Sequence, residues 1–256
     1  MPDGARSPQI PHMADKRYAV VSCHVEQPLD DATWARFAAF QEARPGGFRI
    51  AALMRPPHDE EDAATWLERA REAAARGPLG HHTHWTSPSH ARPTDGDPSQ
   101  PVLDEAAWLR REGLEPRFFC GGGWYMDESV AAALADLGYV DCTATAFRPS
   151  YLAEQAPRIG LDAPAWLRLG DRRLLELPST HSLGMAVRAA ASALPSHVHV
   201  YFHDTDLLDS RRRSALRAAL TVLGRRRAPI DLEQLAADVV DRAPERDFAS
   251  ISQTRS

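Results

Sequence analysis

The chain has 256 residues, of which 43% are hydrophobic and 25% are charged. This composition is ordinary for a globular protein, and the length suffices for one large α/β domain or two small ones. The formal net charge of −5 gives no reason to expect nucleic acid as a partner. Cys23, Cys120 and Cys142 lie far apart and form no CxxC pair. They therefore indicate neither a zinc knuckle nor a disulfide framework.

The chain contains no candidate membrane span. No run of about 18 apolar residues exists, and residues 1–16 lack the apolar centre of a secretory signal. We expect a cytoplasmic protein with a flexible tail over residues 1–16, one domain over 17–242 and a second flexible tail over 243–256. The sequence leaves the oligomeric state open.

Along the chain, short apolar runs alternate with amphipathic stretches. The pattern predicts strands over 18–23, 48–54, 78–85, 116–120, 139–146 and 197–203, and a β-hairpin over 167–178 that turns at Gly170. It predicts helices over 31–43, 59–76, 104–112, 127–137, 182–193, 210–223 and 231–241. Ser210 and Asp231 are the expected N-caps of the last two helices.

Repeated β-α alternation predicts a parallel sheet, either open or closed into a barrel. In both forms functional groups collect at the carboxyl ends of the strands. Polar residues stand where the apolar runs end: His24 and Glu26, His82 and His84, Cys120 with the glycines after it, and His203 with Asp204 and Asp206.

The segment GHHTHW, residues 80–85, contains three histidines. Strand alternation puts His82 and His84 on one face and His81 on the other. Two imidazoles on one face can bind a divalent ion if a carboxylate supplies a third ligand. Glu26, at the end of the first strand, is the candidate carboxylate. A histidine pair that is only exposed or hydrogen-bonded is the alternative, and His90 or His181 can supply a further ligand.

Two other motifs carry potential chemistry. His203 ends the apolar run VHVYF and is a candidate general acid or base, because the pKa of a free imidazole is about 6.5; a helix-capping or core histidine is the alternative. In RFFCGGGWY, consecutive glycines let the backbone approach a ligand closely. Trp124 and Tyr125 can stack on a sugar ring or pack beneath the loop.

The order of these motifs resembles that of the polysaccharide deacetylase family, which contains the NodB-homology domain. The most family-like stretch is YFHDTDLLD followed by RRRSALRAALTVLGRRR, and the resemblance spans about residues 17–242. It implies a distorted, incomplete (β/α) barrel whose divalent metal is held by one carboxylate and two histidines. In the family, a second carboxylate acts as base and a late histidine as acid.

The chain departs from the family pattern at three places. His24 stands where the base aspartate is expected, and Cys120 stands where the third motif has arginine. His82 and His84 are two residues apart, whereas the family histidines are four apart.

Carried onto this chain, the resemblance implies one divalent ion on Glu26, His82 and His84, with zinc preferred over cobalt, manganese or nickel. His24 is then the base, or alternatively a ligand, and His203 the acid. The expected substrate contacts are Gly121, Gly122, Trp124, Tyr125 and Asp204.

The implied activity is metal-dependent amide hydrolysis. We expect an N-deacetylase of an acetylated amino sugar, such as a small glycoside, a nucleotide sugar or a lipid-linked precursor. The alternatives are a NodB-like domain that binds sugar without hydrolysis and a metal-dependent sugar epimerase.

Overall fold

The structure is a computed structural model that describes residues 17–153 and 156–252. Its strands are β1 (Tyr18–Val25), β2 (Ala51–Met54), β3 (Leu79–His81), β4 (Phe118–Phe119), β5 (Val140–Asp141), β6 (Ala165–Leu169), β7 (Arg172–Glu176), β8 (His181–Ser182), β9 (His199–His203), β10 (Ala228–Pro229) and β11 (Glu245–Asp247). Its helices are α1 (Asp31–Ala43), α2 (Ala63–Arg76), α3 (Ser99–Arg111), α4 (Glu128–Leu137), α5 (Leu183–Ala189), α6 (Ser210–Arg226), α7 (Leu232–Val239) and α8 (Phe248–Ile251).

The strands form one curved, unclosed sheet in the order β11-β6-β7-β5-β4-β3-β2-β1-β9-β8, with β10 paired to β1. All neighbours are parallel except β6 and β7, which form the expected hairpin around Gly170. The expected α/β fold with an incomplete, distorted barrel is therefore confirmed. None of the described helices is both long and apolar enough to cross a lipid bilayer.

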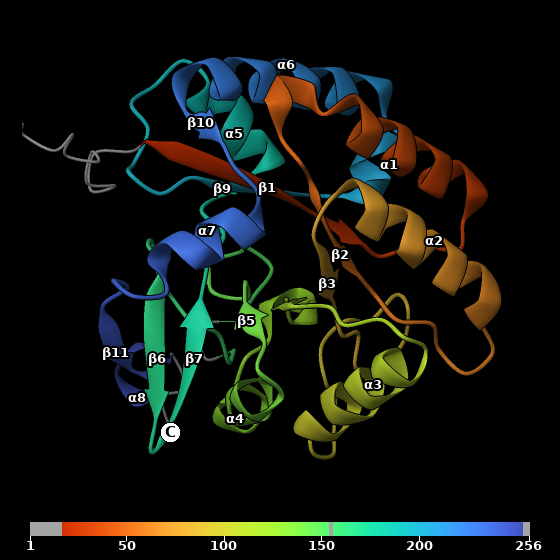
Figure 1. Ribbon diagram of the computed structural model, residues 1–256, viewed down its shortest axis with the longest axis vertical. Coiled ribbons are helices and arrows are strands. Elements are labelled where there is room, and N and C mark those ends of the chain that lie inside the picture. Colours follow the sequence, from red (N-terminus) through yellow and green to blue (C-terminus); the bar gives the residue numbers. More distant parts are fainter. Residues whose placement is uncertain (1–16, 154–155, 253–256) are drawn as a thin grey trace, which may run out of the picture.

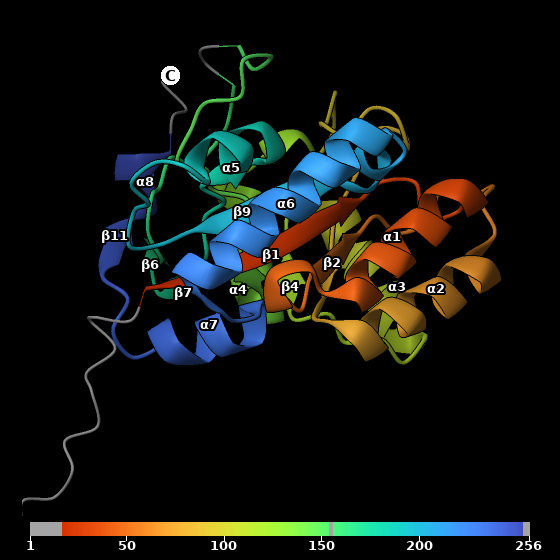
Figure 2. The ribbon, with the colours of Figure 1, turned by 90° about the horizontal axis from the view of Figure 1, so that it is seen from above.

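Alternation along the strands divides the apolar residues between two faces of the sheet. Val21 and Cys23 of β1 pack outward in a core with α1, α2 and α6, and these three helices lie side by side along this flank (Figures 1 and 2). Val20 points inward, where Leu232 and Leu235 of α7 join the interior core. Because α7 follows β10, which pairs with the first residues of β1, α7 closes the amino end of the barrel. The carboxyl end is left for polar groups.

Several element boundaries differ from the expected ones, because capping side chains set them. Asp62, which accepts hydrogen bonds from two backbone amides, starts α2 later than residue 59. Asp209, not Ser210, caps α6 by accepting from the amides of Arg211 and Arg212. Asp231 caps α7 as expected. The strand expected over 78–85 ends at His81.

The described residues after 242 are more ordered than expected. Residues 243–256 were expected to be a flexible tail, yet within residues 243–252 β11 pairs with β6 and α8 follows it, while residues 253–256 lie outside the described residues. Phe248 is buried in the core beneath α4, and burial of this ring holds the segment in place. The tail expected over residues 1–16 lies outside the described residues.

Candidate active site

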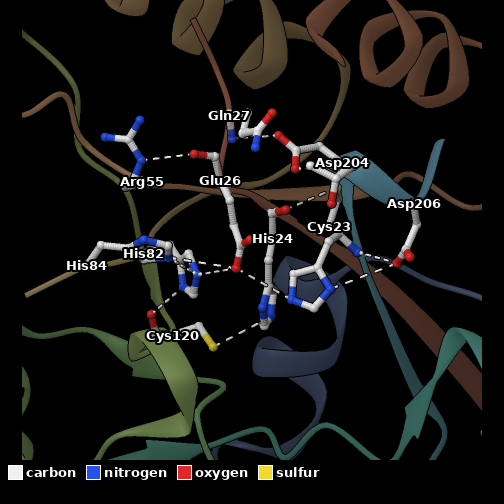
Figure 3. Close-up of polar contacts among 12 residues, drawn as sticks. Cys23, His24, Glu26, Gln27, Arg55, His82, His84, Cys120, Asp204 and Asp206 are labelled. Carbon is white, nitrogen blue, oxygen red and sulfur yellow. Dashed lines mark hydrogen bonds and ion pairs between the residues drawn. The ribbon is translucent and has the colours of Figure 1, made fainter. Parts of the chain in front are cut away.

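Three potential metal ligands meet where β1 and β3 end (Figure 3). The Nε2 atoms of His82 and His84 are 3.3 Å apart. Oε1 of Glu26 lies 3.9 Å from the first and 3.7 Å from the second. These separations are close to the roughly 3.4 Å between ligands of a tetrahedral site with metal bonds of 2.0–2.2 Å. The structure thus brings together the three residues expected to hold a metal.

Backbone contacts orient the two imidazoles toward one point. Nδ1 of His82 donates to the carbonyl of Cys120 at 2.8 Å, and Nδ1 of His84 donates to the carbonyl of Pro88 at 3.0 Å. A carbonyl oxygen only accepts, so each neutral ring carries its hydrogen on Nδ1 and a lone pair on Nε2. Two facing lone pairs cannot hydrogen-bond each other. Beside a carboxylate they make the donor set that a divalent cation takes, so these residues fit a metal.

The protonation states agree with this role. Burial lowers the pKa of His84 to about 3, so the ring is neutral near pH 7. Burial by itself raises the pKa of Glu26, but the adjacent His82 and His203 outweigh it and lower the pKa to about 2. The site therefore presents an ionised carboxylate at Glu26 beside a neutral His84 ring.

The remaining histidine of GHHTHW, His81, lies on the outer face of the sheet and makes different contacts. Nε2 of His81 contacts the carboxylate of Glu105 on α3 at 2.6 Å, and Nδ1 contacts the hydroxyl of Tyr139 at 3.3 Å. His81 therefore ties β3 to the helix layer, as the predicted alternation requires.

His203 lies beside the carboxylate of the ligand set. Its Nε2 atom is 3.5 Å from Oε1 of Glu26, and its Nδ1 atom is 3.9 Å from Oδ2 of Asp206. The same Asp206 oxygen accepts the backbone N–H of His203 at 3.0 Å, and Arg212 holds the other oxygen at 2.7 Å. Asp206 therefore positions His203. The sequence placed Asp206 at this strand end but did not predict the contact.

His24 faces the same space from β1. It is 3% exposed and pairs in register with His203 of β9. Its ring lies 4.7 Å from that of His82, centroid to centroid, and its Nε2 atom lies 3.6 Å from Sγ of Cys120. Burial, with the nearby histidines, lowers the pKa of His24 well below the usual value. The imidazole is therefore neutral at physiological pH and can accept a proton.

A pocket of about 240 Å³ opens beside these groups. Its lining is His24, Glu26, Ser89, His90, Ala91, Arg92, Gly123, Trp124, Tyr151 and His203. Trp124 forms one wall of the pocket. The centroid of its ring lies 5.1 Å from that of His24 and 4.7 Å from that of Tyr201. The φ angle of Trp124 is 59°, a left-handed conformation that is costly for a residue with a Cβ atom.

Three of the expected substrate contacts in the glycine-rich segment lie away from this pocket. A Cβ atom on Gly122 would come within 2.5 Å of the carbonyl of Thr83, and one on Gly121 within 2.2 Å of the carbonyl of Tyr125. These glycines allow close chain packing, and the neighbouring Gly123 lines the pocket instead. The Tyr125 hydroxyl donates to Asp127 at 2.7 Å, away from the histidines.

Asp204 was also expected to contact substrate, and the structure corrects this. Asp204 is fully buried, and its Oδ2 atom accepts the backbone N–H of Gln27 at 2.9 Å. Burial raises the pKa of its carboxyl group to about 6. The residue ties the end of β9 to the end of β1. A short 3-10 turn over residues 204–207 changes the direction of the side chain, which strand alternation does not predict.

The two optional ligands named from the sequence lie outside the ligand set. His90 is exposed at the rim of the pocket, and Nδ1 of His181 contacts the hydroxyl of Thr180 at 2.8 Å. Arg92 and Tyr151, which line the pocket, were missed. Both come from long loops whose course no local pattern indicates.

A second pocket, of about 580 Å³, lies on the other side of Glu26 and also contains His84. Buried Arg55, directly after β2, borders it. The Arg55 guanidinium pairs with Glu61 at 2.6 Å and 2.8 Å and donates to the backbone carbonyl of Glu26 at 2.9 Å. Arg55 therefore fixes the backbone that carries the carboxylate ligand, and the site is open on two sides of Glu26.

No family model and no curated protein matches the chain, but solved structures do. A Mycobacterium smegmatis protein provisionally described as a polysaccharide deacetylase superposes with a TM-score of 0.64 at 15% identity, covering 91% of this chain and 94% of its own. The chain has the fold of the polysaccharide deacetylases. The "T48 deacetylase with substrate" superposes with a TM-score of 0.51 at 10% identity, covering 88% of this chain and 92% of its own.

The same fold also includes a protein without activity. A Bacillus anthracis protein described as a CE4 family pseudoenzyme superposes with a TM-score of 0.53 at 11% identity, covering 86% of this chain and 66% of its own. A mutant of that protein is described as having restored enzymatic activity. At these identities the polysaccharide deacetylase likeness establishes the fold, and the site residues must carry the functional argument.

Proposed function

We propose that the chain is a metal-dependent amide hydrolase that removes the acetyl group from an acetylated amino sugar, with residues 17–242 as its catalytic unit. The observation that carries this is the convergence of the Glu26 carboxylate and the Nε2 lone pairs of His82 and His84 at 3.3–3.9 Å. A further histidine, His203, stands on the pocket side of this group. Hydrolysis of an amide needs an electrophilic centre, a base and an acid. The ligand group can hold the first, and the histidines around it can supply the other two.

Glu26, His82 and His84 would hold the ion. When bound, the metal supplies polarisation of the amide carbonyl and a lowered pKa for water. His24 accepts the proton that water loses, at the ring nitrogen left free when Nε2 donates to the Cys120 sulfur. His203 gives a proton to the leaving nitrogen, and Asp206 keeps that ring oriented. Water and amide are thereby converted to acetate and amine.

The pocket geometry supports a small sugar unit as the group that enters. Trp124 offers an aromatic wall beside His24 and His203, and aromatic rings pack well against the apolar faces of small ligands. The second pocket shares Glu26, Ser89 and Ala91 with the first, which leaves room for a substrate that extends beyond the reacting unit.

A second candidate is a sugar-binding domain without hydrolysis. The replacement of the base carboxylate by His24 favours it, since the low pKa of that ring makes it a weak base. The pseudoenzyme with this fold provides a precedent.

Acetate release decides between the two. The zinc-reconstituted protein is incubated with a panel of N-acetylated amino sugars, nucleotide sugars and oligosaccharides, and free acetate is measured by an enzyme-coupled assay. If the chain is a deacetylase, at least one substrate should release acetate, and Glu26→Gln should reduce the rate of release. Sugar binding in calorimetry without acetate release would support the binding domain and contradict the hydrolase.

A further inference from the structure

A second group of donor atoms lies deeper in the barrel than the Glu26 set. His24, His82 and Cys120 are all buried, and one donor atom from each lies within 4.8 Å of the others. They come from β1, from the residue after β3 and from the residue after β4, so the carboxyl ends of three strands on one side of the sheet order supply them. Figure 3 shows the sulfur of Cys120 directed at the His24 ring.

The thiol is the one hydrogen-bond partner of the His24 ring among the described residues, at 3.6 Å from Nε2. A tetrahedral ion with a bond of about 2.3 Å to sulfur and about 2.05 Å to nitrogen separates such ligands by about 3.5 Å. The observed distance therefore suits a shared ion as well as it suits a hydrogen bond. His24 also lines the 240 Å³ pocket, which gives an ion a route inward.

The two donor sets differ in chemical character. Glu26, His82 and His84 offer oxygen and nitrogen, whereas His24, His82 and Cys120 offer nitrogen and sulfur. Thiolate ligands select soft cations, and carboxylates favour hard ones. Both sets need His82, so a single ion occupies one position or the other.

We propose that His24, His82 and Cys120 form a second metal position that binds soft d10 cations such as cadmium, mercury(II) and copper(I). Binding replaces the thiol proton, which passes to solvent, by a metal–sulfur bond, and no oxidation or reduction takes place. An ion in this position uses the lone pair of the His24 ring. On the proposed function, such an ion therefore removes the base and inhibits hydrolysis, but the binding itself does not depend on that function.

The test uses the whole protein and Cd²⁺ as the probe. Ultraviolet sulfur-to-cadmium charge-transfer absorption is titrated in the wild type and in Cys120→Ser, Cys142→Ser and His84→Ala. Cys142 is a matched control because it is equally buried but belongs to neither donor set. We expect saturation at one ion per chain in the wild type, Cys142→Ser and His84→Ala, with the band lost in Cys120→Ser.

Cadmium-113 NMR of the wild type reports sulfur ligation without any substitution, so the proposal stays testable if Cys120→Ser folds poorly. A downfield, sulfur-containing resonance supports the proposal. A resonance typical of nitrogen and oxygen ligands only, a band that persists in Cys120→Ser, or a band that disappears in His84→Ala would each overturn it. Absence of acetate release in the functional assay leaves these outcomes unaffected.

Discussion

Sγ of Cys120 lies 3.6 Å from Nε2 of His24. These two residues occupy the positions where the family resemblance implies an arginine and a carboxylate base. Charged groups shift each other's pKa mainly within about 4–6 Å, so a cation at position 120 would act directly on residue 24. An arginine would keep a carboxylate ionised but would depress the pKa of a histidine further. The contact supports the idea that the two positions were exchanged together.

A double-mutant cycle tests this coupling. His24→Asp alone should impair turnover, because the buried carboxylate lacks a cation. Cys120→Arg alone should impair it, because a cation is buried beside a neutral ring. The double variant should recover part of the activity, with an interaction energy of about 0.5–3 kcal/mol, the usual span for contacting residues.

Measurement of kcat/KM for the four proteins gives the interaction energy, and unfolding in urea checks that each is folded. In the matched control cycle, His24→Asn takes the place of His24→Asp, because asparagine has the shape of aspartate without its charge. In that cycle, adding Cys120→Arg should recover no activity. Strictly additive losses in the aspartate cycle would reject the coupling.

The metal site is tested by elemental analysis after reconstitution with zinc, cobalt or manganese. We expect about one ion per chain in the wild type and a severe loss in the variant that combines His82→Ala with His84→Ala, because both Nε2 ligands are gone. His90→Ala, on the exposed loop next to the site, is the control and should keep its metal. A metal-free wild type refutes the site, and full occupancy in the double variant means that other residues are the ligands.

His203 is expected to act in catalysis without holding the ion. His203→Gln should lower turnover by about 10²–10⁴-fold, the range for loss of a general acid, while metal content stays unchanged. Asp206→Asn keeps the shape but weakens the orientation of the ring, so its loss should be smaller. Wild-type turnover in His203→Gln would exclude the role, and loss of metal would make His203 a ligand, since Nε2 is only 3.5 Å from Glu26.

Strand alternation was sufficient to predict that His24 and His203 face the same space. Parallel strands bring their carboxyl ends together, and a period of two along β1 and β9 puts His24 and His203 on the inner face. What the alternation could not predict begins where a strand ends. Asp204 starts a 3-10 turn and points into the protein. The same limit applies to Arg92, which reaches the pocket from a loop.

Long-range pairing was the other limit. The segment Glu245–Asp247 is polar and exposed, so its sequence carries no apolar period of two, and only its pairing with β6 makes it a strand. At α6, Asp209 and Ser210 are both good N-cap residues. The choice between them depends on which side chain meets the free amides of the first turn.

Acid is expected to destabilise the fold through two core histidines. Burial lowers the pKa of His197 to about 4 and that of His199 to about 3, whereas an unfolded histidine titrates near about 6.5. Between these values the unfolded chain binds more protons than the folded chain, so the free energy of unfolding falls as the pH drops from about 6.5 toward 4. The contribution of the two buried neutral rings to the free energy of unfolding is fully present above about pH 6.5.

His199 allows a specific check. Its Nδ1 donates to the Leu177 carbonyl at 3.2 Å and its Nε2 accepts from the Ser22 hydroxyl at 2.8 Å. His199→Gln keeps a donor and an acceptor but removes the titration. The pH dependence of unfolding in urea should then weaken by up to about 1.4 kcal/mol per pH unit between pH 6 and 4, relative to the wild type. His90→Gln, an exposed histidine, should leave the slope unchanged, and an unaltered slope in His199→Gln would contradict the assignment.

Trp124 combines an unfavourable backbone conformation with a place in the pocket wall. With φ at 59°, any residue with a Cβ atom is strained there by roughly 1–2 kcal/mol, whereas glycine is not. Both Trp124→Ala and Trp124→Gly lose the buried ring, which costs about 3–5 kcal/mol. In urea unfolding, we expect the free energy of unfolding of Trp124→Gly to exceed that of Trp124→Ala by about 1 kcal/mol. This is the reverse of the order at ordinary positions. Trp85, which is not among the described non-glycine residues with positive φ, provides the matched pair, and there alanine should be the more stable.

Turnover should fall in both Trp124 variants, because the ring that packs on His24 is lost. Greater stability of Trp124→Ala than of Trp124→Gly would show that the backbone at this position is not under strain in solution.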